Sequence, residues 1–323
     1  MIGAVFIGVI DRGTNVLQVR PTTLCPLNCV FCSVDAGPRS RWRQAEYTVS
    51  SPEWLAKWAG RIARFKGGGV EALIDGVGDP FTYPRLPELV SLLKREEGVE
   101  WVAVETHGWA LTIPLVERLE EAGLDRINLS LDTLDPAQAR LLTGTPWYPL
   151  ERIIRVAEYI ARETSIDLHV TPVWVPGVND EAVRRVVEWA YRIGAGKRWP
   201  PVTIQKYNVH RYGRRVPRVK PQSWREFWER LRRLEAETGL RVTWTMEEWG
   251  MERRPRVPLP YRKGSRLRVR AAAPGWIRGT LTAVTLDGEW LVTVRRAPRV
   301  PQGSTLRVRV SEAYDSIIIA EPA

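Results

Sequence analysis

The sequence predicts an α/β protein: a partial barrel of six βα units, a (β/α)6 fold, followed by a small antiparallel β-barrel. From Val16 onward, short apolar runs that end in Gly, Thr or Asp alternate with amphipathic stretches, which is typical of βα units repeated around a parallel sheet. Over about the last sixty residues, apolar and polar side chains alternate strictly, as in antiparallel strands. A Pro-rich stretch, residues 253–260, separates the two patterns.

Six apolar runs predict the strands of the first barrel, and amphipathic runs between them predict its helices. The expected strands are residues 16–20, 72–74, 101–105, 126–131, 167–173 and 202–206. The expected helices include residues 86–97, 115–122, 150–163 and 180–193. Parallel barrels place their chemistry at the C-terminal ends of the strands, so the site is expected at these ends.

The chain after Gly213 loses the βα pattern. It begins with a basic connector, residues 214–220, and continues with a helix for which Ser223 and Glu226 form a predicted capping box. A further strand is expected at residues 240–245. Four alternating segments separated by turns then predict the small antiparallel barrel: residues 267–270, 291–294, 306–310 and 317–319.

The length of 323 residues suits about two domains, and a hydrophobic content of 44% excludes global disorder. We expect a barrel with a short N-terminal extension (1–213), a connector and linker (214–260), and the small barrel (261–323). The longest apolar run, residues 1–10, is too short to span a bilayer and lacks the basic flank of a signal peptide. A cytoplasmic protein with no membrane partner is therefore expected. Few Met, Cys and His beside many Arg, Pro and Trp favour a heat-adapted source.

The three cysteines of the chain, Cys25, Cys29 and Cys32, form a C-x3-C-x2-C array directly after the first strand. Three clustered thiols exclude a secreted disulfide framework. Soft thiolates on one loop suit an iron-sulfur cluster or zinc. Structural zinc normally takes four protein ligands, and no His or further Cys lies nearby. A four-iron cube held by three thiolates keeps one iron open for a substrate or cofactor.

This spacing, with Phe31 just before the last Cys, resembles the cluster motif of the radical S-adenosylmethionine (radical SAM) superfamily. Residues 76–80, Gly-Val-Gly-Asp-Pro, follow the second strand and resemble the superfamily's G-G-E-P element, whose backbone holds the amino group of SAM. Val77 and Asp79 replace the usual Gly and Glu. The resemblance therefore implies that the backbone of this element binds SAM, and it implies no role for the two side chains. A plain βα turn would also account for the Gly and Pro.

Later strand ends continue the resemblance. Residues 106–108, Thr-His-Gly, resemble a T-N-G element, although a His at a turn also serves as an ordinary hydrogen-bonding residue. Residues 128–132 match an S-L-D segment, in which Ser130 would meet the SAM carboxylate and Asp132 would point toward the ribose or the active site. Their alternation on a strand puts both on one face. Residues 175–180 resemble the P-G-x-N-D turn of the branch related to molybdenum-cofactor synthase, and part of that turn also suits a helix N-cap.

The resemblance implies a partial TIM-like barrel in which the three cysteines hold a 4Fe-4S cluster and SAM chelates the open iron. One-electron reduction by a donor such as a ferredoxin or flavodoxin would cleave SAM to methionine and a 5'-deoxyadenosyl radical. The implied SAM contacts are Phe31, Gly78, Asp79, Thr106, Ser130, Asp132 and Gln205.

The cysteine count also restricts the chemistry. No thiol remains for a second cluster or for catalytic cysteines, which excludes sulfur insertion and the reaction of ribosomal-RNA type radical methylases. The fifteen residues before the first strand leave no room for a cobalamin domain. What remains is chemistry started by hydrogen abstraction, methyl transfer from a second SAM included.

The formal net charge of +11 favours a polyanionic partner. Residues 261–323 hold eleven Lys or Arg against five Asp or Glu, a net charge of +6, and alternation along strands projects several Arg from one face. The segment resembles the TRAM domain, a small OB-like barrel that binds tRNA in several modification enzymes; a solvated face of a heat-adapted barrel is the alternative. The predicted RNA contacts are Arg266, Arg268, Arg270, Arg295, Arg296, Arg307 and Arg309.

Residues 205–215 continue the basic character at the barrel mouth, where phosphate contacts are expected. Tyr207 suits either such a contact or core packing.

The whole chain, particularly residues 10–13, 20–24 and 172–177, resembles an archaeal group that methylates the threonylcarbamoyl side chain of N6-threonylcarbamoyladenosine in tRNA to the hydroxynorvalyl form. The target is an unactivated methyl carbon, which a polar mechanism cannot usefully deprotonate and a radical can attack. Two alternatives stay open. One is a radical SAM enzyme acting on another tRNA nucleoside or a small molecule, and the other is a non-catalytic RNA-binding metalloprotein.

Overall fold

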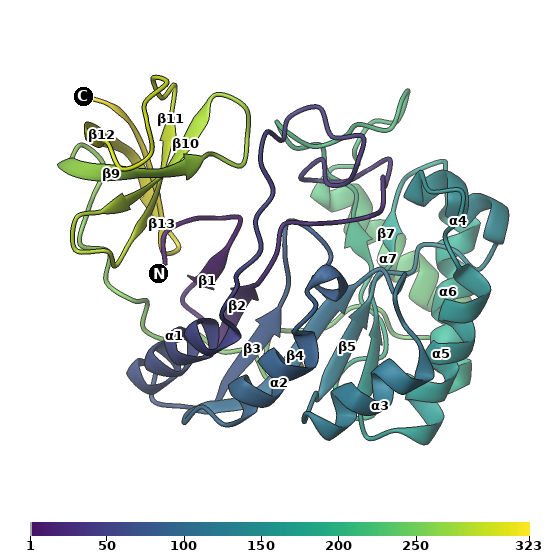
Figure 1. Cartoon of the computed structure of the whole chain (residues 1–323). Coiled ribbons are helices and arrows are strands. Elements are labelled where there is room, and N and C mark those ends of the chain that lie inside the picture. The colour runs from purple at the N-terminus through teal and green to yellow at the C-terminus, as the bar shows by residue number, and fades with distance from the viewer. Residues whose placement is uncertain (1) are drawn as a thin grey trace. The chain divides into compact units, whose positions relative to one another are not determined.

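The computed structural model describes residues 2–323 and consists of two compact units (Figure 1). Of the described residues, the first unit comprises residues 2–24, 41–101 and 252–323, and the second comprises Cys25–Ser40 and Val102–Met251. The three-part division of the chain at residues 213 and 260 follows other boundaries and stays a prediction. No helix within residues 2–323 has the length and apolar character needed to cross a membrane.

The first unit begins with an antiparallel hairpin. β1 (Gly8–Asp11) pairs with β2 (Val16–Arg20), and β2 pairs in parallel with β3 (Val70–Ile74). The strands of the α/β part follow the order β1-β2-β3-β4-β5-β6, and the boundary between the units falls within β4 (Val99–Thr106). The helices that precede β4 are α1 (Pro52–Phe65), the short 3-10 helix η1 (Pro80–Thr82) and α2 (Leu86–Lys94).

The second unit continues the alternation of parallel strands and helices. β4 pairs with β5 (Arg126–Leu129) and β5 with β6 (Asp167–Val170), while β7 (Val173–Trp174) and β8 (Gln205–Lys206) form a separate parallel pair. Its helices are α3 (Ile113–Glu121), α4 (Pro136–Thr143), α5 (Leu150–Glu163), α6 (Asp180–Ile193) and α7 (Trp224–Thr238). The α/β core predicted from the sequence is confirmed.

Apolar periodicity and capping side chains explain the helices that match their predicted bounds. α5 buries Ile153, Val156 and Ile160 along one face, at the three- and four-residue spacing of a core-facing helix. The capping box of α7 is confirmed, because Ser223 Oγ accepts from the Glu226 N–H and the Glu226 carboxylate accepts from the Ser223 N–H at 2.7 Å.

Three expected strands are shorter in the structure. The strand expected at residues 126–131 ends at Leu129, and of residues 202–206 only the last two lie in a strand. The strand expected at residues 167–173 is divided into β6 and β7. Pro172 lies in the gap between them and has no N–H to donate to a ladder.

The strand expected at residues 240–245 is not formed. A side chain takes over the hydrogen bonds that a neighbouring strand would supply, since Glu235 Oε1 accepts from the N–H groups of Val242 and Thr243, each at 2.8 Å. It also accepts from the Thr243 hydroxyl at 2.7 Å. The segment is therefore held in an extended loop against the end of α7.

The C-terminal part of the first unit is a closed five-stranded barrel. Its strands, β9 (Arg266–Pro274), β10 (Thr280–Thr285), β11 (Leu291–Arg295), β12 (Thr305–Tyr314) and β13 (Ile317–Pro322), close in the order β10-β11-β13-β12-β9. The expectation of a fully antiparallel barrel is wrong at one pair, because β11 and β13 run parallel. The β12–β13 hairpin reverses the chain once, which returns β13 to the direction of β11 and closes the barrel without an open edge.

A buried histidine makes the stability of the second unit sensitive to acid. His169 on β6 is 2% exposed, and its Nδ1 donates to the Pro200 carbonyl at 2.6 Å. Burial, assisted by the Arg126 guanidinium, lowers its pKa from 6.5 to about 3, while the bond to Pro200 raises it. The neutral ring is therefore the form that fits the fold.

We expect His169→Gln to flatten the dependence of stability on pH. A histidine whose pKa is lower in the folded state contributes stability that is fully present above about pH 6.5 and is lost as the pH falls toward about 3. This loss amounts to at most about 1.4 kcal/mol per pH unit. Urea unfolding at several pH values would measure it, with the exposed His210→Gln as the matched control. Equal slopes in all three proteins would contradict the prediction.

Candidate functional site

The three cysteines, none of which forms a disulfide among residues 2–323, lie on one loop at the start of the second unit. Cys29 is buried, and Cys25 and Cys32 are half-buried. The loop turns back on itself, since the Cys32 N–H donates to the Cys29 carbonyl at 3.1 Å and the Ala36 N–H lies 3.2 Å from the Cys32 sulfur. The N–H of Asn28 donates to the Thr143 carbonyl at the end of α4, at 2.9 Å. Backbone hydrogen bonds thus connect the cysteine loop to the end of α4.

The charges of the thiols affect one another. Burial raises the pKa of the Cys29 thiol well above its usual value, and the negative charges of Cys32, Cys25 and Asp132 raise it further. The Arg214 guanidinium acts in the opposite direction and lowers it. The Cys29 thiolate is favoured by nearby positive charge, which Arg214 supplies and iron would supply when bound.

Arg214 connects the basic segment after Gly213 to the cysteine loop. Its backbone N–H donates to the Cys32 carbonyl at 2.7 Å, and its Nε forms an ion pair with Asp35 at 2.8 Å. Its Nη1 and Nη2 donate to the carbonyls of Cys29 and Ala36. Nothing in the residue pattern distinguishes Arg214 from the exposed arginines near it, so sequence reasoning grouped it with expected phosphate contacts.

His107 lies beside the cysteines, which corrects the expectation that no histidine is nearby. Its Nε2 is 3.9 Å from the Cys29 sulfur. Cys29 and His107 are 78 positions apart in the chain. His107 reaches the cysteine loop because it follows directly after the last residue of β4. Within residues 2–323, no three His, Cys, Asp or Glu side chains converge closely enough to hold one metal ion. In a 4Fe-4S cluster each thiolate binds a separate iron atom. The three sulfur atoms therefore do not have to meet around one ion.

Three predicted SAM contacts lie at the ends of β4 and β5, and all three are buried. The Thr106 hydroxyl accepts from the Gly108 N–H at 2.9 Å, and the Ser130 hydroxyl lies 3.2 Å from that of Thr171. Ser130 and Asp132 follow the end of β5, so strand alternation is not what orients them. Asp132 accepts from the Val173 N–H at 2.8 Å, and burial raises the pKa of its carboxyl.

The remaining predicted residues of the second unit differ in exposure. Phe31 is buried beside the cysteines, whereas Gln205 is exposed on β8. Tyr207 is 2% exposed and its hydroxyl accepts from the Val216 N–H at 2.9 Å, so core packing is the correct alternative for this residue. Arg211 and Arg215 remain exposed.

In the first unit, the predicted SAM element at residues 76–80 packs against the end of β2 through its backbone. A Cβ on Gly78 would lie 2.2 Å from the Leu24 carbonyl oxygen, so only glycine fits there. The Asp79 N–H donates to the same carbonyl at 2.8 Å, and the Asp79 carboxylate accepts from the Phe81 N–H at 3.0 Å and caps η1. Backbone packing at Gly78 and the Asp79 cap thus fix the local shape of this element, and its contact with SAM stays a prediction.

Arg43 holds this element from the other side, and sequence reasoning missed it. Its side chain is 3% exposed. Nη1 donates to the Thr23 carbonyl at 2.6 Å, and Nη2 donates to the Val77 carbonyl. The guanidinium lies 4.9 Å from the centre of the Trp276 ring, on the connection between β9 and β10. An arginine in a polar loop has no pattern that would reveal this role.

Five arginines form a basic surface on the outer face of the C-terminal barrel, and we call it the arginine face. The β9–β12 register places Arg307 opposite Arg268 and Arg309 opposite Arg266. All members are exposed, and among residues 2–323 none forms an ion pair. Of the two other predicted RNA contacts, Arg295 pairs with Glu312 and Arg296 is exposed. The members of the arginine face are Arg266, Arg268, Arg270, Arg307 and Arg309.

Comparisons with known proteins agree with the cysteine motif and the fold. The Radical SAM superfamily pattern matches residues 19–190. An uncharacterized protein of Methanocaldococcus jannaschii is 33% identical over 342 residues, which cover 99% of this chain and 78% of that protein. The GTP 3',8-cyclase of Chlorobaculum tepidum is 28% identical over 55% of this chain and 50% of the cyclase. The chain thus spans about half the length of the cyclases that it matches.

Among solved structures, a radical SAM methyltransferase from Sphaerobacter thermophilus has a TM-score of 0.53 at 19% identity, covering 71% of this chain and 65% of that one. SuiB of Streptococcus suis bound to S-adenosylmethionine has a TM-score of 0.51 at 18% identity, covering 72% and 51%. At these identities the likeness concerns the fold alone.

Proposed function

The chain belongs to the radical SAM superfamily, whose enzymes use a 4Fe-4S cluster and S-adenosylmethionine, and from this premise we propose that it modifies tRNA. The proposed reaction methylates the threonylcarbamoyl side chain of N6-threonylcarbamoyladenosine to the hydroxynorvalyl form. The observation that supports the tRNA assignment is the arginine face, five exposed cations on a closed barrel that form no ion pair with any described residue.

Cys25, Cys29 and Cys32 are the residues that would hold the cluster. Their common loop, their soft sulfur atoms and the cationic Arg214 beside them fit a group that needs three thiolates. When bound, the cluster and SAM supply a 5'-deoxyadenosyl radical, which abstracts hydrogen from an unactivated carbon. Enzymes of this superfamily require a reductant, for which we propose a ferredoxin or flavodoxin.

We assign SAM to the residues that the family resemblance implies. The backbone of residues 76–80 would receive the methionine amino group, with Gly78 as its central residue. Ser130 would meet the carboxylate, and Thr106, Asp132, Phe31 and Gln205 would surround the remaining atoms. Asp79 would contribute its backbone alone, because its carboxylate caps η1.

Arg43→Met is expected to weaken SAM binding by roughly 10- to 100-fold, because it removes charged hydrogen bonds to the carbonyls of Thr23 and Val77. Iron content should stay at the wild-type level, which separates a positioning role from general misfolding. Equilibrium dialysis with SAM would measure the affinity, with the exposed Arg41→Met as the control. Parallel losses of iron and SAM in Arg43→Met would refute the positioning role.

The arginine face supports a polyanionic substrate on energetic grounds. Like charges directly opposite one another on neighbouring strands destabilise a sheet. Arg307 opposite Arg268 and Arg309 opposite Arg266 therefore cost stability in the free protein, and phosphate groups would remove that repulsion. A row of such cations suits a polymer of phosphates better than a single small anion.

A second candidate is a reaction on a free nucleotide, which the matches to GTP 3',8-cyclases favour. The two candidates differ in what accumulates without the enzyme. Mass spectrometry of nucleosides from tRNA of a deletion strain should show N6-threonylcarbamoyladenosine without the hydroxynorvalyl form. An unchanged hydroxynorvalyl nucleoside would refute the proposed substrate, and stimulation of SAM cleavage by GTP alone would favour the second candidate.

A further inference from the structure

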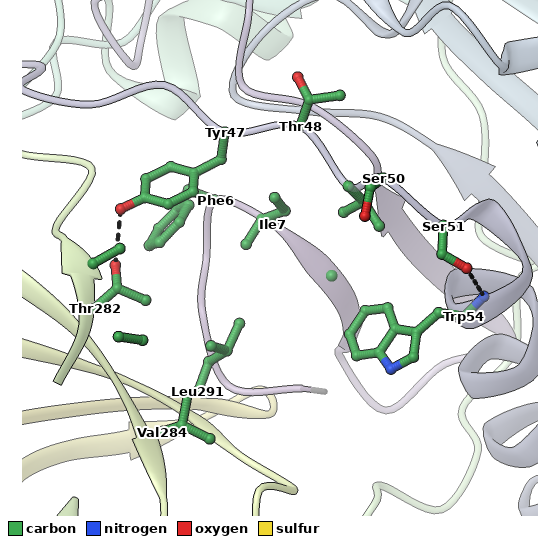
Figure 2. A pocket seen from close by; sticks show the side chains of 14 residues that line it. Phe6, Ile7, Tyr47, Thr48, Ser50, Ser51, Trp54, Thr282, Val284 and Leu291 are labelled. Atoms are coloured by element: carbon green, nitrogen blue, oxygen red, sulfur yellow. Dashed lines mark hydrogen bonds between the residues drawn. The ribbon is translucent and has the colours of Figure 1, made fainter. Parts of the chain in front are cut away.

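The first unit contains a concave site whose lining residues include none of residues 76–80. It is a cavity of about 490 Å³, within the range of small-ligand sites. Figure 2 shows the rings of Phe6 and Tyr47 on one side of it and Trp54 on the other. Strands of the barrel contribute Ala272, Ala273, Thr282, Val284 and the first residue of β11, Leu291.

Hydrogen bonds hold the aromatic wall in position. The Tyr47 hydroxyl donates to the Pro274 carbonyl at the end of β9, and its ring centre lies 5.2 Å from that of Phe6. Across the cavity, Ser51 Oγ accepts from the Trp54 N–H at 3.4 Å and caps α1 (Figure 2). The Tyr47 ring is thus held in position, which lowers the entropic cost of stacking a flat ligand on this wall.

The barrel register connects this cavity to the arginine face. Val284 on β10 stands directly opposite Arg270 on β9, so the two side chains share the outer face of the barrel. A register shift between Thr282 and Ala283 leaves Ala272 without a direct partner, and this small residue and Ala273 line the cavity. The arginine face therefore borders the cavity through Arg270 and Val284, and no charged side chain lines the cavity itself.

We propose that the cavity binds one unstacked base of the RNA whose phosphates contact the arginine face, an inference that rests on the proposed RNA substrate. No charged side chain lines the cavity, so a neutral group fits it. Aromatic rings offer stacking partners, and the Ser50 hydroxyl offers a hydrogen bond to a base edge. A neutral aromatic ring carried on a polyanion is the chemistry of a nucleobase.

The test compares a short oligoadenylate with an abasic oligonucleotide of the same length, each titrated against the full chain. Wild type should bind the oligoadenylate about tenfold tighter, the value of one base stacked on an aromatic side chain. Val284→Trp, which fills the cavity, and Trp54→Ala, which removes a wall, should both abolish this difference and leave abasic binding unchanged.

Two control variants make the same kinds of change outside the cavity. One introduces a tryptophan, as Val284→Trp does, and the other replaces a tryptophan by alanine, as Trp54→Ala does. Leu286→Trp enlarges an exposed residue just beyond β10, and Trp224→Ala shortens an exposed tryptophan at the start of α7. Both should keep the preference for bases. Equal binding of the two probes by wild type, or a loss of preference in the controls, would overturn the proposal. If tRNA still binds in that case, only the base site fails; if tRNA does not bind either, the RNA substrate fails as well.

Discussion

Cys29→Ser is expected to abolish SAM cleavage, leaving 5'-deoxyadenosine at the level of protein without iron. Replacing the thiol removes one of three soft ligands, and the chain has no other cysteine to substitute for it. Cys25→Ser and Cys32→Ser should have the same effect. The measurements are iron and sulfide content after anaerobic reconstitution, together with 5'-deoxyadenosine by liquid chromatography.

The control for this loss is Ser33→Ala, an exposed position on the same loop. It should keep the cluster and the activity. Because backbone hydrogen bonds to α4 hold the cysteine loop, the three Cys→Ser proteins should also remain folded by circular dichroism. Stoichiometric zinc in wild type with intact SAM, or an active Cys29→Ser protein, would contradict the assignment.

Replacing all five members of the arginine face by Gln should weaken tRNA binding by more than about tenfold at low salt. For each phosphate that the variant no longer neutralises, the slope of log affinity against log salt should become shallower by about 0.7 to 0.9. Removal of the opposed Arg pairs, 307 with 268 and 309 with 266, should leave the free energy of unfolding unchanged or raise it. SAM cleavage without tRNA should not change.

The matched control for the arginine face removes positive charge elsewhere. Arg232 and Arg233 are exposed on α7, in the second unit. Their double Gln variant should leave the salt slope and tRNA affinity close to wild type. If it lowers affinity as much per charge as the arginine face does, binding depends on net charge alone.

The elements predicted most closely are those with strong local signals. Val16–Arg20 is an apolar strand, and α5 and α6 have regular apolar faces, so local patterning determines their bounds. The alternation of β9 and β12 likewise predicted arginines on one outer face. By contrast β1, β10, α1 and α4 were missed, because their short or mixed patterns become strands and helices only when packed.

At the candidate site, the residues that belong to local motifs could be predicted from the sequence. Residues that contact the site from distant positions in the chain could not. The cysteine spacing and Gly78 are local patterns. His107 beside Cys29, Arg214 on the cysteine loop and Arg43 on residues 76–80 arise from contacts between distant segments. No periodicity records such contacts, because each depends on where two turns of the folded chain meet.

The most direct test of the central claim is tRNA-dependent radical chemistry in one assay. Anaerobically reconstituted protein, with SAM and a chemical reductant, would be incubated with tRNA that carries N6-threonylcarbamoyladenosine, with unmodified transcript, or with GTP. We predict that only the modified tRNA stimulates 5'-deoxyadenosine formation and that its nucleoside gains the mass of one methylene group. Stimulation by GTP alone, or no stimulation by any tRNA, would contradict a tRNA-modifying radical SAM enzyme.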